Sequence, residues 1–137
     1  MDKKDWQYNE LAFYTLVQPD DAFIHQHIVD ARMGQTADEQ TKPVSIVFAL
    51  IGLYLLVEKG FNGRQVQQFH MKMSRNKRTW PEINLPVSRG NMDVSDVLAA
   101  DPGPDRDEMI RNWCRSVWEA YKKSHSVIIS LVEQSSK

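Results

Sequence analysis

Apolar residues recur at helical spacing through most of the chain. One run, from Val44 to Val57, is apolar nearly all round and is interrupted by Ser45 and Gly52. A helix of this kind must be surrounded by other helices, so we expect residues 44–58 at the centre of the fold. The remaining helices should each present one apolar stripe to this centre. They are predicted at residues 5–17, 20–34, 63–76, 94–100 and 105–134.

Capping and turn residues mark the ends of these predicted helices. Pro43 suits the first turn of the central helix, where its missing N–H costs little. Gly60 tolerates the left-handed conformation that follows a helix end, and Asp20 and Asp93 are placed to cap the helices after them. The last predicted helix is about 30 residues long, which is long for a globular domain. A bend is therefore expected near residues 124–126.

Between the fourth and fifth predicted helices the chain is irregular. Residues 77–92 contain two prolines and Gly90, and Trp80 is expected to tether this crossover to the core. No segment alternates between apolar and polar residues as a half-buried strand would. The sequence therefore predicts an all-α, single-domain bundle over residues 1–137, with five or six helices packed around helix 44–58.

Composition and charge narrow the class of protein. The 137 residues include 17 basic and 18 acidic residues, and the net charge of −1 gives no general attraction to nucleic acid or to an anionic membrane. With Cys114 as its one cysteine, the chain cannot form an internal disulfide, and a reducing compartment suits it. The charged N-terminus does not read as a signal peptide. The 14-residue apolar run is shorter than the roughly 20 residues of a membrane span. We expect a cytoplasmic protein with no membrane partner.

Two of the four histidines fall on the apolar stripes of predicted helices. On the second helix, His27 lies inside the stripe and Asp30 lies at its edge, whereas His25 faces water. On the fourth helix, His70 lies on the inward stripe. A buried imidazole must find a hydrogen-bond partner. We therefore expect His27 and His70 to approach each other, or to share Asp30 or Glu58.

These side chains also make a candidate metal site. Two imidazoles with one or two carboxylates are a ligand set for zinc, iron or manganese. His27, Asp30, His70 and Glu58 could thus hold a divalent transition metal that activates water for hydrolysis. The alternative is structural, because a histidine bonded to a carboxylate satisfies two polar groups in a core. The sequence assigns no catalytic residue.

Basic residues gather in one part of the chain. Residues 59–78 hold six basic residues and no acidic one, whereas residues 93–108 hold six acidic residues and one basic. A helix, Gly60 and a second helix are arranged here as in a helix-turn-helix, and Arg64, Lys72 and Arg75 would contact DNA. A solvated helix face is the simpler interpretation, because the net charge is −1. We expect no binding to duplex DNA.

Several stretches together resemble a bacterial family of unknown function. The resemblance covers nearly the whole chain and implies a free-standing cytoplasmic bacterial protein, but it brings no activity with it. The main stretches are His25-Gln26-His27-Ile28-Val29-Asp30-Ala31, Glu58-Lys59-Gly60-Phe61-Asn62-Gly63-Arg64-Gln65-Val66-Gln67, His70 and Thr79-Trp80-Pro81.

Four interpretations of the function stay open on these observations. The leading interpretation is a binding or interaction module with a buried His/Asp cluster and a small-molecule ligand of unknown identity. The alternatives are a metal-dependent, hydrolase-like enzyme that uses this cluster, and a DNA-contacting regulator that uses residues 59–78. A homodimer with a structural role is a further possibility.

Overall fold

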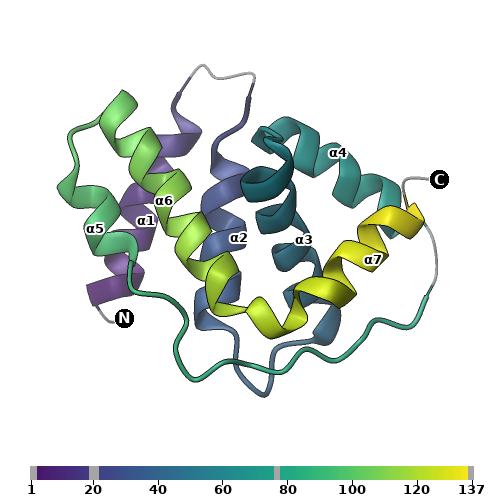
Figure 1. Ribbon diagram of the computed structural model, residues 1–137. Coiled ribbons are helices and arrows are strands. Elements are labelled where there is room, and N and C mark those ends of the chain that lie inside the picture. The colour runs from purple at the N-terminus through teal and green to yellow at the C-terminus, as the bar shows by residue number, and fades with distance from the viewer. Residues whose placement is uncertain (1–2, 19–21, 76–77, 136–137) are drawn as a thin grey trace.

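The computed structural model describes residues 3–18, 22–75 and 78–135. Within these ranges the chain forms seven α-helices and one short 3-10 helix, and it forms no strand (Figure 1). This confirms the all-α, single-domain bundle. In chain order the elements are α1 (Lys3–Leu16), α2 (His25–Thr36), α3 (Pro43–Lys59), α4 (Gly63–Ser74), α5 (Val94–Ala99), α6 (Pro104–Ala120), η1 (Lys122–Ser124) and α7 (His125–Ser135).

Three helices share the centre of the bundle. Helix α3 is buried without a break from Ala49 to Leu55, as its apolar sequence predicts. Helices α2, α3 and α6 all contact one another, and α2 also contacts α1 and α4. Figure 1 shows α6 crossing α2. Helix α3 is therefore central, but α2 is enclosed as well. Helix α6 covers both α2 and α3, and it does so with large buried side chains such as Trp113 and Trp118.

Local sequence signals fix the junction between α3 and α4. Pro43 occupies the first turn of α3, and Gly60 ends the helix with a left-handed φ of 71°. The Gly60 and Phe61 N–H groups donate to carbonyl oxygens of the last turn of α3, which satisfies groups that a helix end leaves open. Asn62 and Gln65 then form a reciprocal capping box at the start of α4. The predicted bounds of α3 are confirmed to within one residue, and so is the predicted start of α4 at Gly63. The predicted end of α4, residue 76, lies outside the described residues.

The predicted start of α2 is wrong. The helix begins at His25, not at residue 20, because Phe23 has a left-handed φ of 54° that no helix can contain. The backbone of this segment packs on the first turn of α4, where the Arg64 N–H donates to the Ala22 carbonyl at 2.9 Å. Asp20, the predicted cap, lies outside the described residues.

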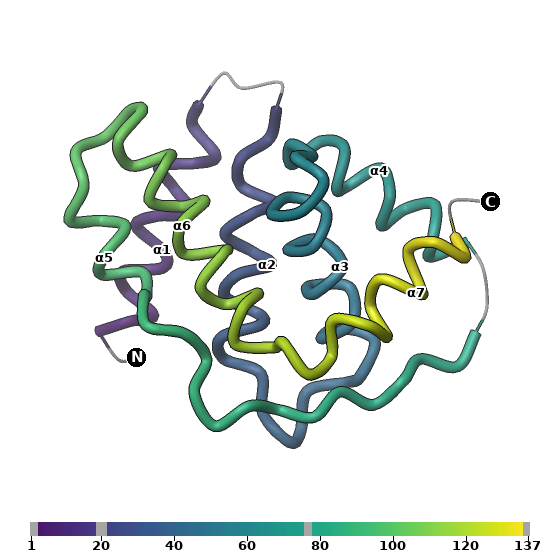
Figure 2. The backbone as a smooth tube through the Cα atoms, in the orientation of Figure 1, coloured from purple at the N-terminus to yellow at the C-terminus, as the bar shows by residue number. Residues whose placement is uncertain are grey.

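The last predicted helix bends where expected. It divides into α6, η1 and α7, and the tube in Figure 2 turns sharply between α6 and α7. His125 stacks on Trp118 with ring centroids 3.7 Å apart, and its Nε2 lies 2.8 Å from the Trp118 carbonyl oxygen. Since a carbonyl oxygen can only accept, Nε2 donates this bond and ties α7 to the end of α6.

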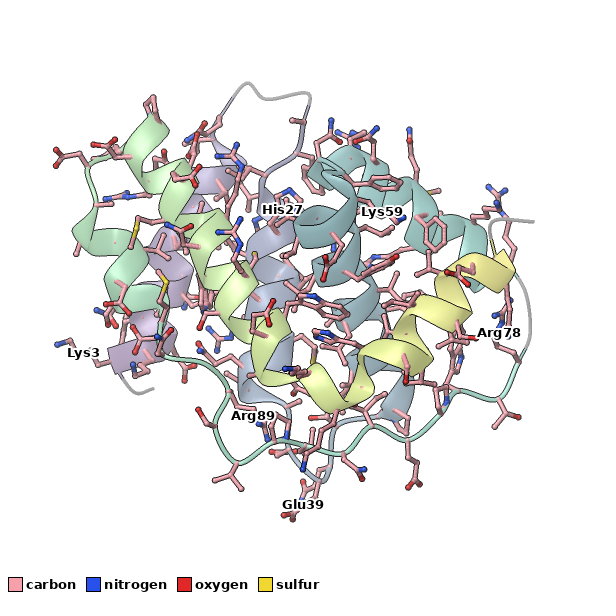
Figure 3. All side chains as sticks on the ribbon, in the orientation of Figure 1. Lys3, His27, Glu39, Lys59, Arg78 and Arg89 are labelled. Atoms are coloured by element: carbon pink, nitrogen blue, oxygen red, sulfur yellow. The ribbon has the colours of Figure 1, made fainter. Side chains whose placement is uncertain are left out.

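Residues 78–92, which we call the strap, run from α4 to α5 along one end of the bundle (Figure 2). The predicted tether is confirmed, because Trp80 packs edge-on against Phe48 of α3 with centroids 5.2 Å apart. Arg89, labelled in Figure 3, lies beside the end of α2 and donates to the carbonyl oxygens of Ala37 at 2.7 Å and Gly34 at 3.4 Å. The strap therefore supplies hydrogen bonds that complete the end of α2.

Among the helices in the described ranges, none has the length and apolar character needed to cross a membrane.

Candidate functional site

Helix α2 contributes to two cavities. His27, 5% exposed, lines a cavity of about 600 Å³ together with Asn62, Asp107 and Arg111. Figure 3 shows His27 on the part of α2 that lies beside α3. Asp30, 3% exposed, lines a different cavity of about 380 Å³. Residues three apart on a helix lie only about 60° apart around its axis, so His27 and Asp30 are neighbours on α2 that nevertheless line different cavities.

We call the second cavity the Asp30 crevice. Its walls are mainly apolar side chains of α2 and α3, and Asp30 and Ala49 form its floor because they are the buried members of the lining. His70 of α4 stands at its edge. The remaining lining residues are Gln26, Val29, Met33, Val44, Ser45 and Phe48.

Asp30 is held by one hydrogen bond and by a close fit to α3. Its Oδ1 accepts from Gln26 Nε2 at 3.1 Å, whereas its Oδ2 has no hydrogen-bond partner among the described residues. A Cβ atom added to Gly52 would lie 1.9 Å from Oδ2. Asp30 therefore occupies a notch that exists because residue 52 has no side chain.

Burial is the main influence on the ionisation of Asp30. It raises the pKa of the carboxyl group well above its ordinary value, and the Gln26 hydrogen bond opposes this rise. The negative charge of Asp30 in turn contributes to the raised pKa values of Tyr8 and Cys114, after burial as the larger cause. Tyr8 belongs to α1 and Cys114 to α6. No basic side chain of the described residues lowers the pKa of Asp30.

His70 is positioned by α3. Its Nε2 lies 2.8 Å from the Phe48 carbonyl oxygen, and its ring stacks on the Phe48 ring with centroids 5.1 Å apart. Burial lowers the pKa of His70, and the bond to Phe48 partly offsets this. Because a carbonyl oxygen can only accept, the neutral ring carries its proton on Nε2 and keeps Nδ1 as an acceptor.

The structure does not gather the four predicted metal ligands. Asp30 and His70 share a crevice, His27 lines the other cavity, and Glu58 accepts a hydrogen bond from Trp118 Nε1 at 2.9 Å. In the part of the chain that the structure describes, no group of three or more His, Cys, Asp or Glu residues could hold a metal ion. The hydrogen bonds of His70 and Glu58 lead to Phe48 and Trp118. That the two histidines share Asp30 or Glu58 as a partner stays a prediction.

His25 does not face water as the sequence predicted. It is half-buried, with Nδ1 2.9 Å from Thr15 Oγ1 and its ring 5.8 Å from that of Phe23. Burial lowers the pKa of this imidazole. The prediction was wrong because α1 and the segment before α2 cover this side of the helix.

The candidate DNA contacts lie on the exposed side of α4. Arg64, Lys72 and Arg75 are all exposed. The Arg64 guanidinium, however, lies 4.9 Å from the centre of the Phe23 ring and donates to Gln67 Oε1 at 2.7 Å. One of the three basic groups is thus engaged within the protein, and the absence of DNA binding stays a prediction.

The outer face of α1 exposes Trp6, Phe13 and Leu16. Trp6 and Phe13 are seven residues apart and so lie on one side of the helix. The described residues do not cover these side chains, and the homodimer stays a prediction.

Gln26 and Gly52 are the site residues that sequence reasoning missed. Gln26 precedes Asp30 by four residues, a spacing at which helical side chains meet, and this signal was available. Gly52 was visible as an interruption of the apolar run. Its role depends on how α2 and α3 pack, which no local pattern shows.

We expect the stability of Asp30→Asn relative to wild type to increase with pH. Because folding raises the pKa of Asp30, the folded protein binds this proton more tightly than the unfolded chain does. The resulting stability is complete below about pH 4 and is lost as the pH rises through the raised pKa. The Asp30→Asn variant has no such loss.

Urea denaturation of both proteins from about pH 4 to about pH 8 measures this difference. Contributions from other titrating groups cancel between the two proteins. A difference that stayed constant across the range would show that Asp30 titrates alike in the folded and unfolded chains.

The fold and the crevice define a small helical protein with a buried acidic residue at its candidate site. The chain belongs to a family of unknown function, DUF5946, whose model matches residues 5–122. The match confirms the resemblance to such a family, and it extends from α1 to η1, so it includes the whole Asp30 crevice. No curated protein and no solved structure matches the chain.

Proposed function

We propose that the protein is a small-molecule binding module and that its ligand occupies the Asp30 crevice. The observation that carries this proposal is the buried Asp30 carboxyl group, whose Oδ2 has no hydrogen-bond partner among the described residues. An unsatisfied buried polar atom costs about 1–3 kcal/mol. A ligand that donates a hydrogen bond to this carboxyl group, with Oδ2 turned from the Gly52 notch toward the crevice, would recover this energy.

The form of the crevice supports a binding role. Its volume of about 380 Å³ falls within the range of roughly 300–1,000 Å³ that is typical of small-molecule sites. Apolar walls with a few placed polar groups are also typical of such sites. Here Val29, Val44 and Phe48 supply apolar surface, while Asp30 and His70 supply polar side chains.

A binding role requires no group beyond those present. The metal-dependent hydrolase suggested by the sequence would need a third ligand beside Asp30 and His70, and the described residues supply none. The binding module is therefore the function that these contacts support best.

Three small probes with the same ring test this proposal: benzylamine, benzyl alcohol and benzoate. We expect at least one of them to shift the backbone amide resonances of Met33 and Ser45 in a saturable way, with a Kd of about 1 mM. The Val29→Trp variant should abolish this binding, because Val29 lines the crevice from a position 37% exposed, where an indole can cover the opening.

The matched control is Val127→Trp. Val127 is 36% exposed on α7 and does not line the crevice, so this variant should bind the probe as wild type does. The proposal fails if none of the three probes shifts these resonances, or if Val29→Trp binds as well as Val127→Trp does.

A further inference from the structure

We infer that the ligand of the Asp30 crevice is a small organic cation, an amine with an apolar body, whose ammonium group forms an ion pair with Asp30. This inference rests on the proposed function of the crevice and names the chemical class of its ligand. It is carried by the position of Asp30 in the lining of the crevice, and by the lack of a basic side chain among the described residues that acts on its carboxyl group.

Among the described residues, no basic side chain is close enough to Asp30 to influence the ionisation of its carboxyl group; Arg111 of α6 acts on Cys114 instead. Tyr8 of α1 and Cys114 of α6 are the groups whose ionisation responds to Asp30, and both are neutral at neutral pH. His70 of α4 lies in the same crevice, with Nε2 committed to the Phe48 carbonyl oxygen. Helix α3 faces Asp30 with Gly52, which cannot titrate.

The basic residue nearest in sequence lies on the other side of α2. Arg32 follows Asp30 by two residues, which turns it about 200° around the helix. Its guanidinium donates to Asp5 Oδ1 and lies 4.1 Å from the centre of the Tyr8 ring. When Asp30 is ionised, its countercharge must therefore come from outside the described residues.

An amine supplies what Asp30 lacks. Its ammonium group brings both a positive charge and hydrogen-bond donors, while its apolar part can lie against Val29, Val44 and Phe48. A carboxylate ligand would be repelled by the ionised Asp30. An alcohol would donate one hydrogen bond but leave the charge uncompensated.

The ion pair has a proton balance that can be measured. At a pH where the carboxyl group of Asp30 is protonated in the free protein, it loses its proton to the buffer on binding. The carboxylate then accepts hydrogen bonds from the ammonium group, whose own proton count does not change. Binding therefore releases up to one proton per ligand. Below the pKa of Asp30, affinity should rise with pH by up to about tenfold per pH unit.

Isothermal titration calorimetry with benzylamine and benzyl alcohol tests this inference. We expect benzylamine to bind at least about tenfold more tightly than benzyl alcohol at about pH 7, a difference typical of one added charge-assisted hydrogen bond. Titrations in two buffers of different ionisation heat should show a net proton release for benzylamine that increases as the pH is lowered, and none for benzyl alcohol.

The Asp30→Asn variant separates charge from shape. It should bind benzylamine about tenfold or more weakly, with no proton release, and should bind benzyl alcohol as wild type does. Asp105→Asn removes an exposed carboxylate of α6 outside the crevice and is the matched control, expected to leave both affinities unchanged.

The outcomes distinguish this inference from the proposed function. Equal affinity of the wild-type protein for the two probes, or unchanged benzylamine affinity in Asp30→Asn, would overturn the amine as the ligand and leave the binding crevice in place. If neither probe nor benzoate bound at the crevice, both proposals would fall together.

Discussion

Gly63→Ala should destabilise the protein by about 3 kcal/mol, although alanine is the better helix former by about 1 kcal/mol. An added Cβ would lie 1.8 Å from the Phe23 carbonyl oxygen and 2.7 Å from its carbonyl carbon. These are backbone atoms, so no side-chain rotation can relieve the overlap. The start of α4 would have to move away from residues 22–24, which would break the hydrogen bond from Arg64 to Ala22.

Gly60→Ala provides the comparison, and urea denaturation measures both variants. Gly60 has a φ of 71°, and a Cβ added there would meet no atom within 4 Å. The Gly60→Ala variant should therefore lose only about 1 kcal/mol of stability, which is the strain of an alanine in the left-handed conformation. If Gly63→Ala were no more destabilising than Gly60→Ala, the close packing of α4 on the segment before α2 would be wrong.

Gly52→Ala is expected to cost about 3 kcal/mol through its overlap with Asp30. The added Cβ would lie 1.9 Å from Oδ2 and 2.7 Å from Cγ of that side chain. Rotation of the carboxyl group can displace the oxygen but not Cγ. The whole side chain would therefore have to leave its rotamer within a packed interface.

A double-mutant cycle with Asp30→Ala isolates this contact. In the Asp30→Ala background the closest remaining neighbour of the new Cβ is Val66 Cγ1 at 3.2 Å, a contact that a small shift can relax. Gly52→Ala should then be nearly neutral, because alanine favours the interior of α3. We expect a coupling energy of at least about 2 kcal/mol from urea denaturation. Additive effects would show that Asp30 does not occupy the Gly52 notch.

The parts of the fold that the sequence predicted are those with local causes. Pro43, Gly60 and Asn62 act on residues within one turn of themselves, so the ends of α3 and the start of α4 can be read from the chain. The start of α2 has a distant cause, because Phe23 takes its left-handed conformation where it packs on α4. Arg89 of the strap acts on α2 from equally far along the chain, and no spacing in the sequence indicates it.

In the candidate site, too, the sequence predicted the features with local causes and missed those that depend on how the helices pack. Helical spacing correctly placed His27 on a buried side of α2, and it placed Asp30 close enough to that side to single it out. Spacing could not show that His27 and Asp30 serve different cavities, since that depends on α2 being enclosed by four helices. The buried metal cluster was inferred as though α2 had one inner face, whereas it has several.

The strap also determines when the crevice can form as the chain folds. Arg89 and Gly34 are 55 positions apart, so the hydrogen bonds at the end of α2 close a long loop. The entropy cost of that closure must be met before these bonds contribute to stability. Met33, a wall of the Asp30 crevice, lies in the same last turn of α2. We therefore expect the Asp30 crevice to be completed late in folding, together with the docking of the strap, so that a partly folded chain would lack it.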